Sequence, residues 1–153
     1  FFHCFSALWP HLTILDENGK LYLRRFFFTP KTKWYRPRFL HYIGQSDSGR
    51  DPHDHPGPFT TKVLSGGYVE SVYFPKQYPK AAVHSLLPGM KQYNPEGHTH
   101  KVDLIAPTWS WVIGWIRGKP WGFWLIDPIN PLTSKWIDSE QYGNKGVEIK
   151  SWQ

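Results

Sequence analysis

The sequence contains very little sulfur: Cys4 is its one cysteine and Met90 its one methionine. A single cysteine excludes an internal disulfide framework and a thiolate-rich zinc site, and it fits a reducing compartment, so we expect a cytoplasmic protein. No apolar run reaches the ~18–20 residues that span a bilayer, so we expect no membrane insertion. The opening FFHCFSALW lacks the basic start and small-residue cleavage site of a secretion signal.

Helical periodicity is also missing, because apolar residues nowhere recur at helical spacing over more than three turns. The 153 residues instead include nine Trp, eight Tyr and ten Phe, punctuated by 14 Pro and 13 Gly. Aromatic residues suit pleated surfaces, and frequent proline and glycine separate short strands. Composition and length therefore predict one all-β domain, a sandwich or small barrel.

Eight strand-forming runs lie between turn signals. They cover residues 20–28, 38–44, 59–65, 68–74, 81–87, 100–106, 110–116 and 121–127. Gly66-Gly67 joins the third run to the fourth and favours a tight hairpin, since glycine tolerates positive φ. Pro88-Gly89 marks a further turn.

This series divides the chain into three parts. We expect an N-terminal lead-in over residues 1–19, a β-barrel over 20–127 and an irregular C-terminal tail over 128–153 that packs on the barrel. A short helix is expected in the tail, around 134–141.

Two close histidine pairs, His53/His55 and His98/His100, stand out among the eight histidines. On an extended strand, residues i and i+2 face the same side, so each pair can present two imidazoles to one point. Imidazole is the commonest metal-binding side chain and suits Zn, Fe, Cu or Ni. One such pair also arises by chance among eight histidines, so spacing alone leaves both a metal site and ordinary polar contacts open.

The surroundings of these pairs resemble the two sequence motifs of the cupin superfamily. The second motif runs G-x5-P-x-G-x2-H, and GMKQYNPEGHTH at 89–100 matches it at Gly89, Pro95, Gly97 and His100. The first motif is matched by His53, His55 and either Gly66 or Gly67, with its opening glycine displaced to Gly49. The resemblance implies a single-domain cupin barrel, a double-stranded β-helix of two antiparallel sheets.

The chain departs from the cupin pattern at two positions. Phe59 or Thr60 stands where the motif has a metal-binding glutamate, and Leu104 stands at the usual asparagine. The resemblance then implies a metal centre of His53, His55 and His100. Asp54 is expected to face away, and Glu70 is a weak candidate for an indirect fourth role.

Such a centre is similar to the three-histidine iron site of thiol dioxygenase cupins, in which open positions bind substrate and O2. The resemblance implies a divalent transition metal, Fe(II) in the first place, with Zn, Mn or Ni as alternatives. It also implies a small-molecule substrate or ligand.

A finer resemblance is to small bacterial and phage-encoded cupin-like proteins with an HDHP motif. It is carried by FLHYIGQSDSGRDPHDHP, GGYVE, HTHKVDL and WGFW, and the likeness extends over residues 20–125. It implies no assigned reaction. A phage origin would imply a location in the virion instead of the cytoplasm.

Four further residues are candidates near the expected centre. His98 and His41 are expected either to contact the metal ligands or to make ordinary structural contacts, and both interpretations stay open. Arg50 and Tyr68 are weak candidates for orienting an anionic substrate. The remaining histidines are expected to be structural or solvated: His3, His11 and His84.

Two regions rich in aromatic residues are candidates for a binding surface. Residues 20–38 hold seven basic residues, six aromatics and no acid, which permits nucleic-acid binding but is also typical of a strand with one solvated face. Five tryptophans follow the second motif, and alternation predicts that Trp109, Trp111 and Trp115 share one face. Three interpretations of these tryptophans stay open: the lining of a ligand pocket, packing inside the barrel, or a subunit interface.

Three functions follow from these features. The first is a divalent-metal-binding cupin of the Fe(II) oxygenase type, acting on a small molecule through His53, His55 and His100. The second is a non-catalytic metal- or sugar-binding module within a homo-oligomer or a larger assembly. The third is a metal-independent sugar-nucleotide isomerase with a histidine as general base.

Overall fold

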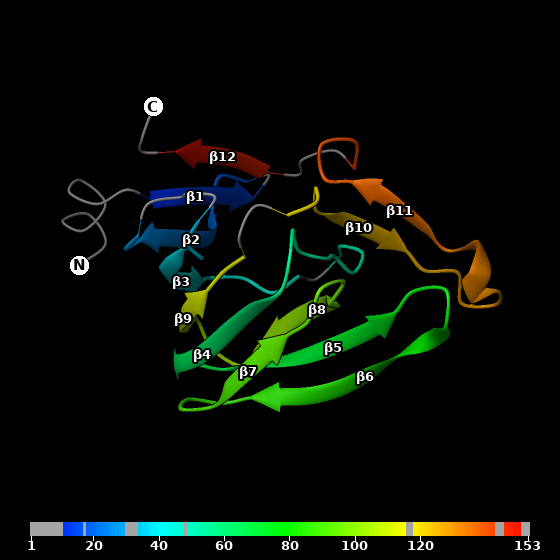
Figure 1. Cartoon of the computed structure of the whole chain (residues 1–153), viewed down its shortest axis with the longest axis horizontal. Helices are drawn as coiled ribbons and strands as arrows, with labels where there is room; N and C mark the ends of the chain where they lie inside the picture. Colours follow the sequence, from blue (N-terminus) through cyan, green and yellow to red (C-terminus); the bar gives the residue numbers. More distant parts are fainter. Residues whose placement is uncertain are drawn as a thin grey trace.

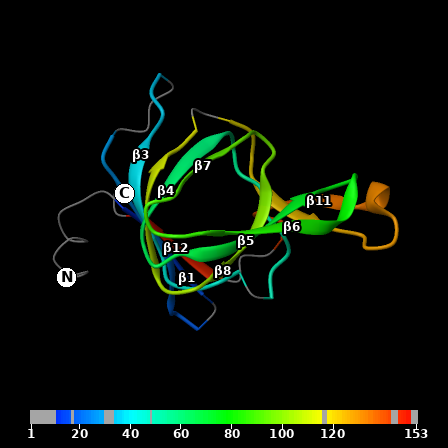
Figure 2. The same cartoon turned by 90° about the horizontal axis from the view of Figure 1, so that it is seen from below.

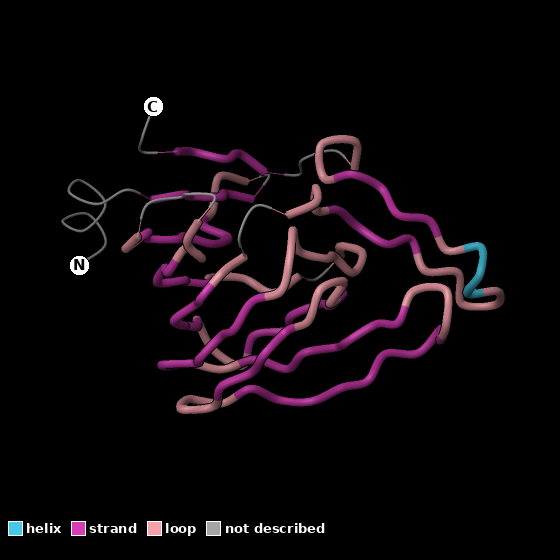
Figure 3. The backbone as a smooth tube through the Cα atoms, viewed as in Figure 1, coloured by secondary structure: helices cyan, strands magenta, loops and turns pink. Residues whose placement is uncertain are grey.

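The computed structural model describes residues 11–16, 18–29, 34–47, 49–115, 118–142 and 146–150. Within these ranges the regular structure is almost entirely β (Figure 3), and the one helical segment is the short 3-10 helix η1, Pro131–Thr133. All strand pairs are antiparallel. The predicted all-β class is confirmed. His3 and Cys4 lie outside the described residues.

The larger sheet has seven strands in the order β12-β1-β2-β3-β9-β4-β7. Their bounds are Gly146–Lys150 (β12), His11–Asp16 (β1), Leu21–Phe27 (β2), Arg38–Ile43 (β3), Thr108–Ile113 (β9), Phe59–Ser65 (β4) and Lys91–Asn94 (β7). Four of these strands, β2, β3, β4 and β9, are among the eight predicted runs. Their alternating side chains put one face of each strand toward the interior.

The smaller layer has two parts, a three-stranded sheet in the order β6-β5-β8 and a two-stranded sheet of β10 and β11. Their bounds are Tyr78–Leu86 (β6), Tyr68–Phe74 (β5), Thr99–Leu104 (β8), Gly122–Leu125 (β10) and Lys135–Asp138 (β11). The β5–β6 and β10–β11 hairpins extend toward the same end of the molecule (Figure 1). Figure 2 shows β3, β4 and β7 opposite β5, β6 and β8, as in a barrel of two facing layers.

Two clusters of buried apolar side chains lie in the interior, and the first of them joins the two layers. One consists of Val63, Tyr68, Leu86 and Val102, from both layers. The other consists of Phe39, Phe59 and Val112, all from the larger sheet. Burial of these side chains is the main favourable free-energy term that holds the two layers together.

The predicted hairpin at Gly66-Gly67 is wrong. β4 pairs with β9 and β7, whereas β5 pairs with β6 and β8, so the two glycines carry the chain from one layer to the other. Both have positive φ, 82° and 119°. The crossing is fixed by Thr108, whose hydroxyl oxygen accepts a hydrogen bond from the Gly67 amide at 2.9 Å.

The predicted helix around 134–141 is also wrong, because residues 135–138 form β11. Trp136 lies opposite Trp124 of β10, and this cross-strand pairing stabilises a strand in place of the expected helix. Three other strands, β1, β7 and β12, were likewise not predicted. β1 and β12 pair with each other in the larger sheet, which therefore extends beyond residues 20–127 at both ends. The division of the chain into three parts stays a prediction.

The tryptophans do not share one face. Trp109 and Trp111 lie on the outer face of β9, where their rings contact Tyr42 at 4.9 Å and Phe28 at 5.2 Å between centroids. Trp115 lies beyond the end of β9, and its ring is instead 6.0 Å from that of His55, inside the barrel. The prediction failed for Trp115 because the strand ends at Ile113 and the alternation ends with it.

The basic aromatic stretch divides between inside and outside. β2 forms its first part, whereas Trp34 and Tyr35 beyond it are 74% and 71% exposed. Nucleic-acid binding by this surface stays a prediction. Among the described residues, no helix is both long and apolar enough to cross a membrane.

The crossing at Gly66 generates a stability prediction. A Cβ at Gly66 would collide with the carbonyl oxygen of Pro107 and lie 2.9 Å from Cα of Thr108, while a Cβ at Gly89 would meet nothing within 4 Å. Both glycines have positive φ, so both alanine variants carry the same backbone strain. We expect Gly66→Ala to lower the free energy of unfolding by about 3 kcal/mol or more, and Gly89→Ala by about 1 kcal/mol, in urea titrations. Equal losses would contradict the tight crossing.

Candidate metal centre

His53 is held by the backbone of β8. It forms an isolated antiparallel bridge with His100, in which the His53 amide donates to the His100 carbonyl at 3.0 Å and the His100 amide donates back at 2.9 Å. A second bridge joins His53 to Phe123 of β10. The segment 51–58 is therefore not the regular strand that we expected. It contributes a single bridging residue between β8 and β10, because its prolines lack the amide hydrogens that a longer ladder needs.

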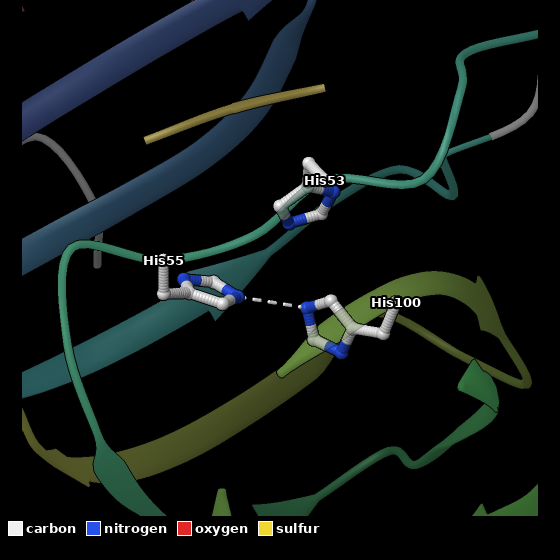
Figure 4. Close-up of side chains that lie close together, drawn as sticks. All are labelled: His53, His55 and His100. Atoms are coloured by element: carbon white, nitrogen blue, oxygen red, sulfur yellow. Dashed lines mark hydrogen bonds between the residues drawn. The ribbon is translucent and has the colours of Figure 1, made fainter. Parts of the chain in front are cut away.

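The three predicted ligands converge on one point. The ring centroids of His53, His55 and His100 are 4.8–5.1 Å apart in every pair. Nε2 of His55 lies 2.9 Å from Nε2 of His100, marked by the dashed line in Figure 4. One nitrogen from each ring lies within 4.8 Å of the others, so the three histidines form one possible metal-binding group.

Asp54 faces away from this group and anchors the loop from its other side. Its carboxylate accepts hydrogen bonds from the Gly122 amide at 2.8 Å and from Trp136 Nε1 at 3.1 Å, and it pairs with Lys119. Asp54 is 1% exposed, so breaking these contacts would leave a buried charge without partners. Its role is to fasten the histidine loop onto the β10–β11 hairpin, and the expected orientation away from the site is correct.

Glu70 has a larger role than the sequence indicated. It lies on β5 and is 1% exposed, and its carboxylate contacts Nδ1 of His100 and Nε2 of His98, the latter at 2.8 Å. Gln92 Nε2 donates to it at 2.7 Å, and His84 Nε2 lies at 2.8 Å. Burial alone would raise the pKa of Glu70, but the hydrogen bonds from His100, His98 and Gln92 hold it well below the usual range.

This contact determines which nitrogen of His100 faces the other histidines. An ionised carboxylate only accepts hydrogen bonds, so Nδ1 of His100 carries the proton. Nε2 is then the lone-pair nitrogen, and it points toward His55. A carboxylate bound to the far nitrogen of a histidine is the usual arrangement around metal-ligating imidazoles.

The three imidazoles suit a divalent transition metal. Two nitrogens at ~2.05 Å from one ion and at right angles to each other are ~2.9 Å apart, which equals the distance between the Nε2 atoms of His55 and His100. Burial lowers the pKa of His53 to about 4, with Asp47 partly opposing the shift and the neighbouring His100 adding to it. Burial and the neighbouring histidines also hold the pKa of His55 well below its ordinary value. Both rings are thus neutral near pH 7, as ligation requires.

A second group of possible ligands consists of Glu70, His98 and His100. It shares His100 with the first group but uses that residue's other side. The carboxylate of Glu70 is already occupied by several nitrogen donors, which favours an orienting role for Glu70 and His98 over direct ligation.

The three histidines line part of a small cavity of about 80 Å³ inside the barrel. Its wall is largely apolar, from side chains such as Leu23, Ile43, Phe59, Val102 and Val112. Pockets for drug-sized ligands are larger, roughly 300–1,000 Å³, so the cavity suits a small molecule.

The polar part of the lining includes two residues that the sequence had singled out, His41 and Tyr68. Burial raises the pKa of Tyr68, so its hydroxyl stays protonated. Arg50 does not line the cavity, and its guanidinium lies over the ring of Tyr22 at 4.5 Å. The arginine that does line the cavity is Arg25, which was not among the predicted site residues. Strand alternation separates Arg24 from Arg25 but does not tell which one faces inward.

Comparison with family models finds no match, and no curated protein matches the sequence. Solved structures do match. A hydroxypropylphosphonic acid epoxidase from S. wedmorenis superposes with a TM-score of 0.52 at 12% identity, covering 68% of this chain and 55% of that one. A structure of Fe(II) HppE superposes with a TM-score of 0.53 at 11% identity, covering 68% of this chain and 56% of that one. A DMSP lyase structure superposes with a TM-score of 0.50 at 17% identity, covering 66% of this chain and 52% of that one.

The chain spans about half the length of these solved structures. At such low identity the likeness concerns the fold alone. Together with the two antiparallel layers, it gives this chain a cupin-type β-barrel fold.

The buried histidines predict an acid-sensitive metal-free protein. His53 has a folded pKa of about 4 and an ordinary value of 6.5, so the unfolded chain binds more protons between these two pH values. Stability is therefore present above pH 6.5 and lost as the pH falls toward 4, by roughly 3 kcal/mol from His53 alone. Urea unfolding of chelator-treated protein across this range measures the loss. A His53→Gln variant with the same pH dependence as the wild type would contradict the assignment.

Proposed function

We propose that this protein is a metal-dependent enzyme of the Fe(II) oxygenase type that acts on a small molecule, with His53, His55 and His100 as the metal ligands. The observation that carries the proposal is the contact between Glu70 and Nδ1 of His100. A buried polar cluster formed for stability alone has no need to bring one nitrogen from each of three imidazoles within 4.8 Å of the others, with a carboxylate behind one of the rings.

The other residues of the site have distinct tasks in this proposal. A divalent metal supplies Lewis-acid and redox chemistry at coordination positions that the three histidines leave open. Glu70 keeps the proton of His100 on Nδ1, and Asp54 holds the loop that carries His53 and His55. The apolar wall excludes bulk water, which strengthens electrostatic interactions with a bound substrate.

Metal content is the direct test. Protein purified without chelators is expected to hold about one transition-metal ion per chain by elemental analysis, iron above Zn, Mn or Ni. The His53→Ala/His100→Ala double variant should hold none, because one remaining histidine is too weak a ligand set. If the metal is iron, O2 consumption with small thiols and small organic acids then tests the oxygenase reaction.

The matched control is His11→Asn. His11 is also buried, but it lies on β1, where its ring contacts Phe26, and it does not line the cavity. This variant should keep its metal. A wild-type protein without stoichiometric metal would overturn the metal centre, and a metal-loaded protein that consumes no O2 with any tested substrate would overturn the oxygenase class alone.

Glu70 provides a second prediction. Glu70→Gln removes the negative charge that favours the Nδ1–H tautomer of His100 while keeping the side-chain size, and it should weaken metal affinity by roughly 10- to 100-fold. Competition with a chromophoric chelator measures the affinity. Glu96→Gln makes the same chemical change on an exposed turn and should leave the affinity unchanged. Equal affinities in Glu70→Gln and wild type would remove Glu70 from the site.

A non-catalytic sugar-binding module is the second candidate. It is favoured by a separate cavity of about 270 Å³, whose lining includes the aromatic residues Tyr73, Phe74 and Trp124 beside Asp54 and Lys119. Aromatic faces beside polar groups suit amphipathic ligands such as sugars. Metal-free wild-type protein in the experiment above would favour this candidate, or a metal-independent isomerase, over the oxygenase.

A further inference from the structure

The neighbouring arginines of β2 face opposite sides of the larger sheet. Arg24 is on the outer side, where its Nε donates to the hydroxyl of Thr13 on β1 at 2.8 Å. Arg25 is on the inner side and lines the cavity that holds the three histidines. Among the cavity-lining residues, all within the described part of the chain, Arg25 is the one lysine or arginine. The cavity therefore contains a permanent positive charge.

The guanidinium of Arg25 is held by aromatic rings. Its Cζ lies 5.4 Å from the ring centroid of Phe39 and 5.8 Å from that of Trp115. Cation–π contacts hold the planar group by its face, whereas the N–H donors of a guanidinium lie along its edge. Burial is the main cause that lowers the pKa values of His41, His53 and His55, and the charge of Arg25 adds to it, which agrees with a position close to the three histidines.

His41 lies beside Arg25 on the same inner face. The two residues are directly opposite each other on β3 and β2, and Ser110 of β9 is the next residue in that row. Nε2 of His41 is buried and has no hydrogen-bond partner among the described residues. Burial and the charge of Arg25 hold the pKa of His41 well below its ordinary value, so the ring is neutral and can donate one hydrogen bond from Nε2.

One acidic residue, Asp47, also lines the cavity, but its carboxylate is already occupied. It accepts a hydrogen bond from the Val102 amide at 2.8 Å and another from the Tyr22 hydroxyl. Both of its oxygens thus already accept hydrogen bonds from donors on the wall. The other carboxylate near the histidines, Glu70, faces Nδ1 of His100, on the far side of that ring from His55.

We propose that Arg25 and His41 form a binding site for a small organic oxyanion inside the barrel. The guanidinium and the Nε2–H of His41 both donate to the oxygens of the anion, which satisfies the buried nitrogen of His41. The metal ligands His53 and His55 line the same cavity, so an anion held here lies beside the proposed metal centre. The inference thus names a small acid as the substrate class of the proposed enzyme. Only the role of the anion as a substrate rests on the proposed function; its binding does not.

The test is a binding measurement on chelator-treated protein at pH 8, where His41, His53 and His55 are neutral. Ligand-observed NMR titrations compare propionate, methylphosphonate and ethanesulfonate with neutral propionamide. We expect at least one anion to bind and propionamide to bind much more weakly. Charge-assisted hydrogen bonds predict that Arg25→Gln raises the Kd of that anion by roughly 10- to 100-fold. The three anions distinguish planar from tetrahedral head groups.

Arg24→Gln is the matched control, because it makes the same change one residue away on the outer face. Its Kd should stay within about twofold of the wild-type value. His41→Phe should raise the Kd by several fold, and Arg25→Lys should give an intermediate value, because lysine keeps the charge but loses the planar fork.

Several outcomes would overturn the site: no anion binding by the wild type, equal affinity for propionamide, or unchanged affinity in Arg25→Gln. Near-UV circular dichroism establishes whether each variant is folded. If Arg25→Gln does not fold, the Kd of Arg25→Lys tests the site instead. Because the protein is metal-free in this experiment, loss of the proposed metal centre would leave the result unchanged, and the two proposals fail separately.

Discussion

The reciprocal backbone hydrogen bonds between His53 and His100 are the constraint on which the candidate site depends. They join two segments nearly fifty residues apart and fix the relative position of two rings before any side-chain interaction is made. A hydrogen-bonded antiparallel pair places its side chains on the same face of the sheet, about 5.5 Å apart at Cα. The backbone of the barrel therefore pre-organises the histidines, and a metal ion would not have to assemble them.

Two buried carboxylates stabilise this arrangement from opposite directions. Asp54 acts on the backbone, because its contacts with Gly122, Lys119 and Trp136 fasten the histidine loop to the β10–β11 hairpin. Glu70 acts on the ring of His100 and selects its tautomer. Each acid is costly to bury and is tolerated only with several donors. Neither carboxylate faces the point where the histidines converge, so neither would be a direct ligand of the proposed metal.

The strands were predictable because their aromatic and β-branched runs are local signals. The grouping of His53, His55 and His100 was implied by the resemblance to the cupin motifs, since spacing alone left a metal site and ordinary polar contacts open. The crossing at Gly66-Gly67 was not predictable, since a hairpin and a layer crossing demand the same glycines and differ only in the distant partners of β4 and β5. Glu70 was only a weak candidate, because its contact with His100 spans 30 residues. Arg25 was missed because alternation gives opposite faces without naming the inner one. The crossing, the contact of Glu70 and the inward orientation of Arg25 all depend on which distant strands pair with each other.

The position of Arg25 links the larger sheet to the chemistry of the smaller layer. The histidine ligands belong to β8 and to the loop bridged to it, whereas Arg25 and His41 come from β2 and β3 across the interior. A small acid between them would contact both layers, with its charged end on the sheet and its remaining atoms toward the histidines. The intervening wall is largely apolar, so the local dielectric is low and strengthens each polar contact with that anion. Selectivity for a small acid then follows from the barrel itself: the distance between its two layers limits the length of the molecule that can reach both ends.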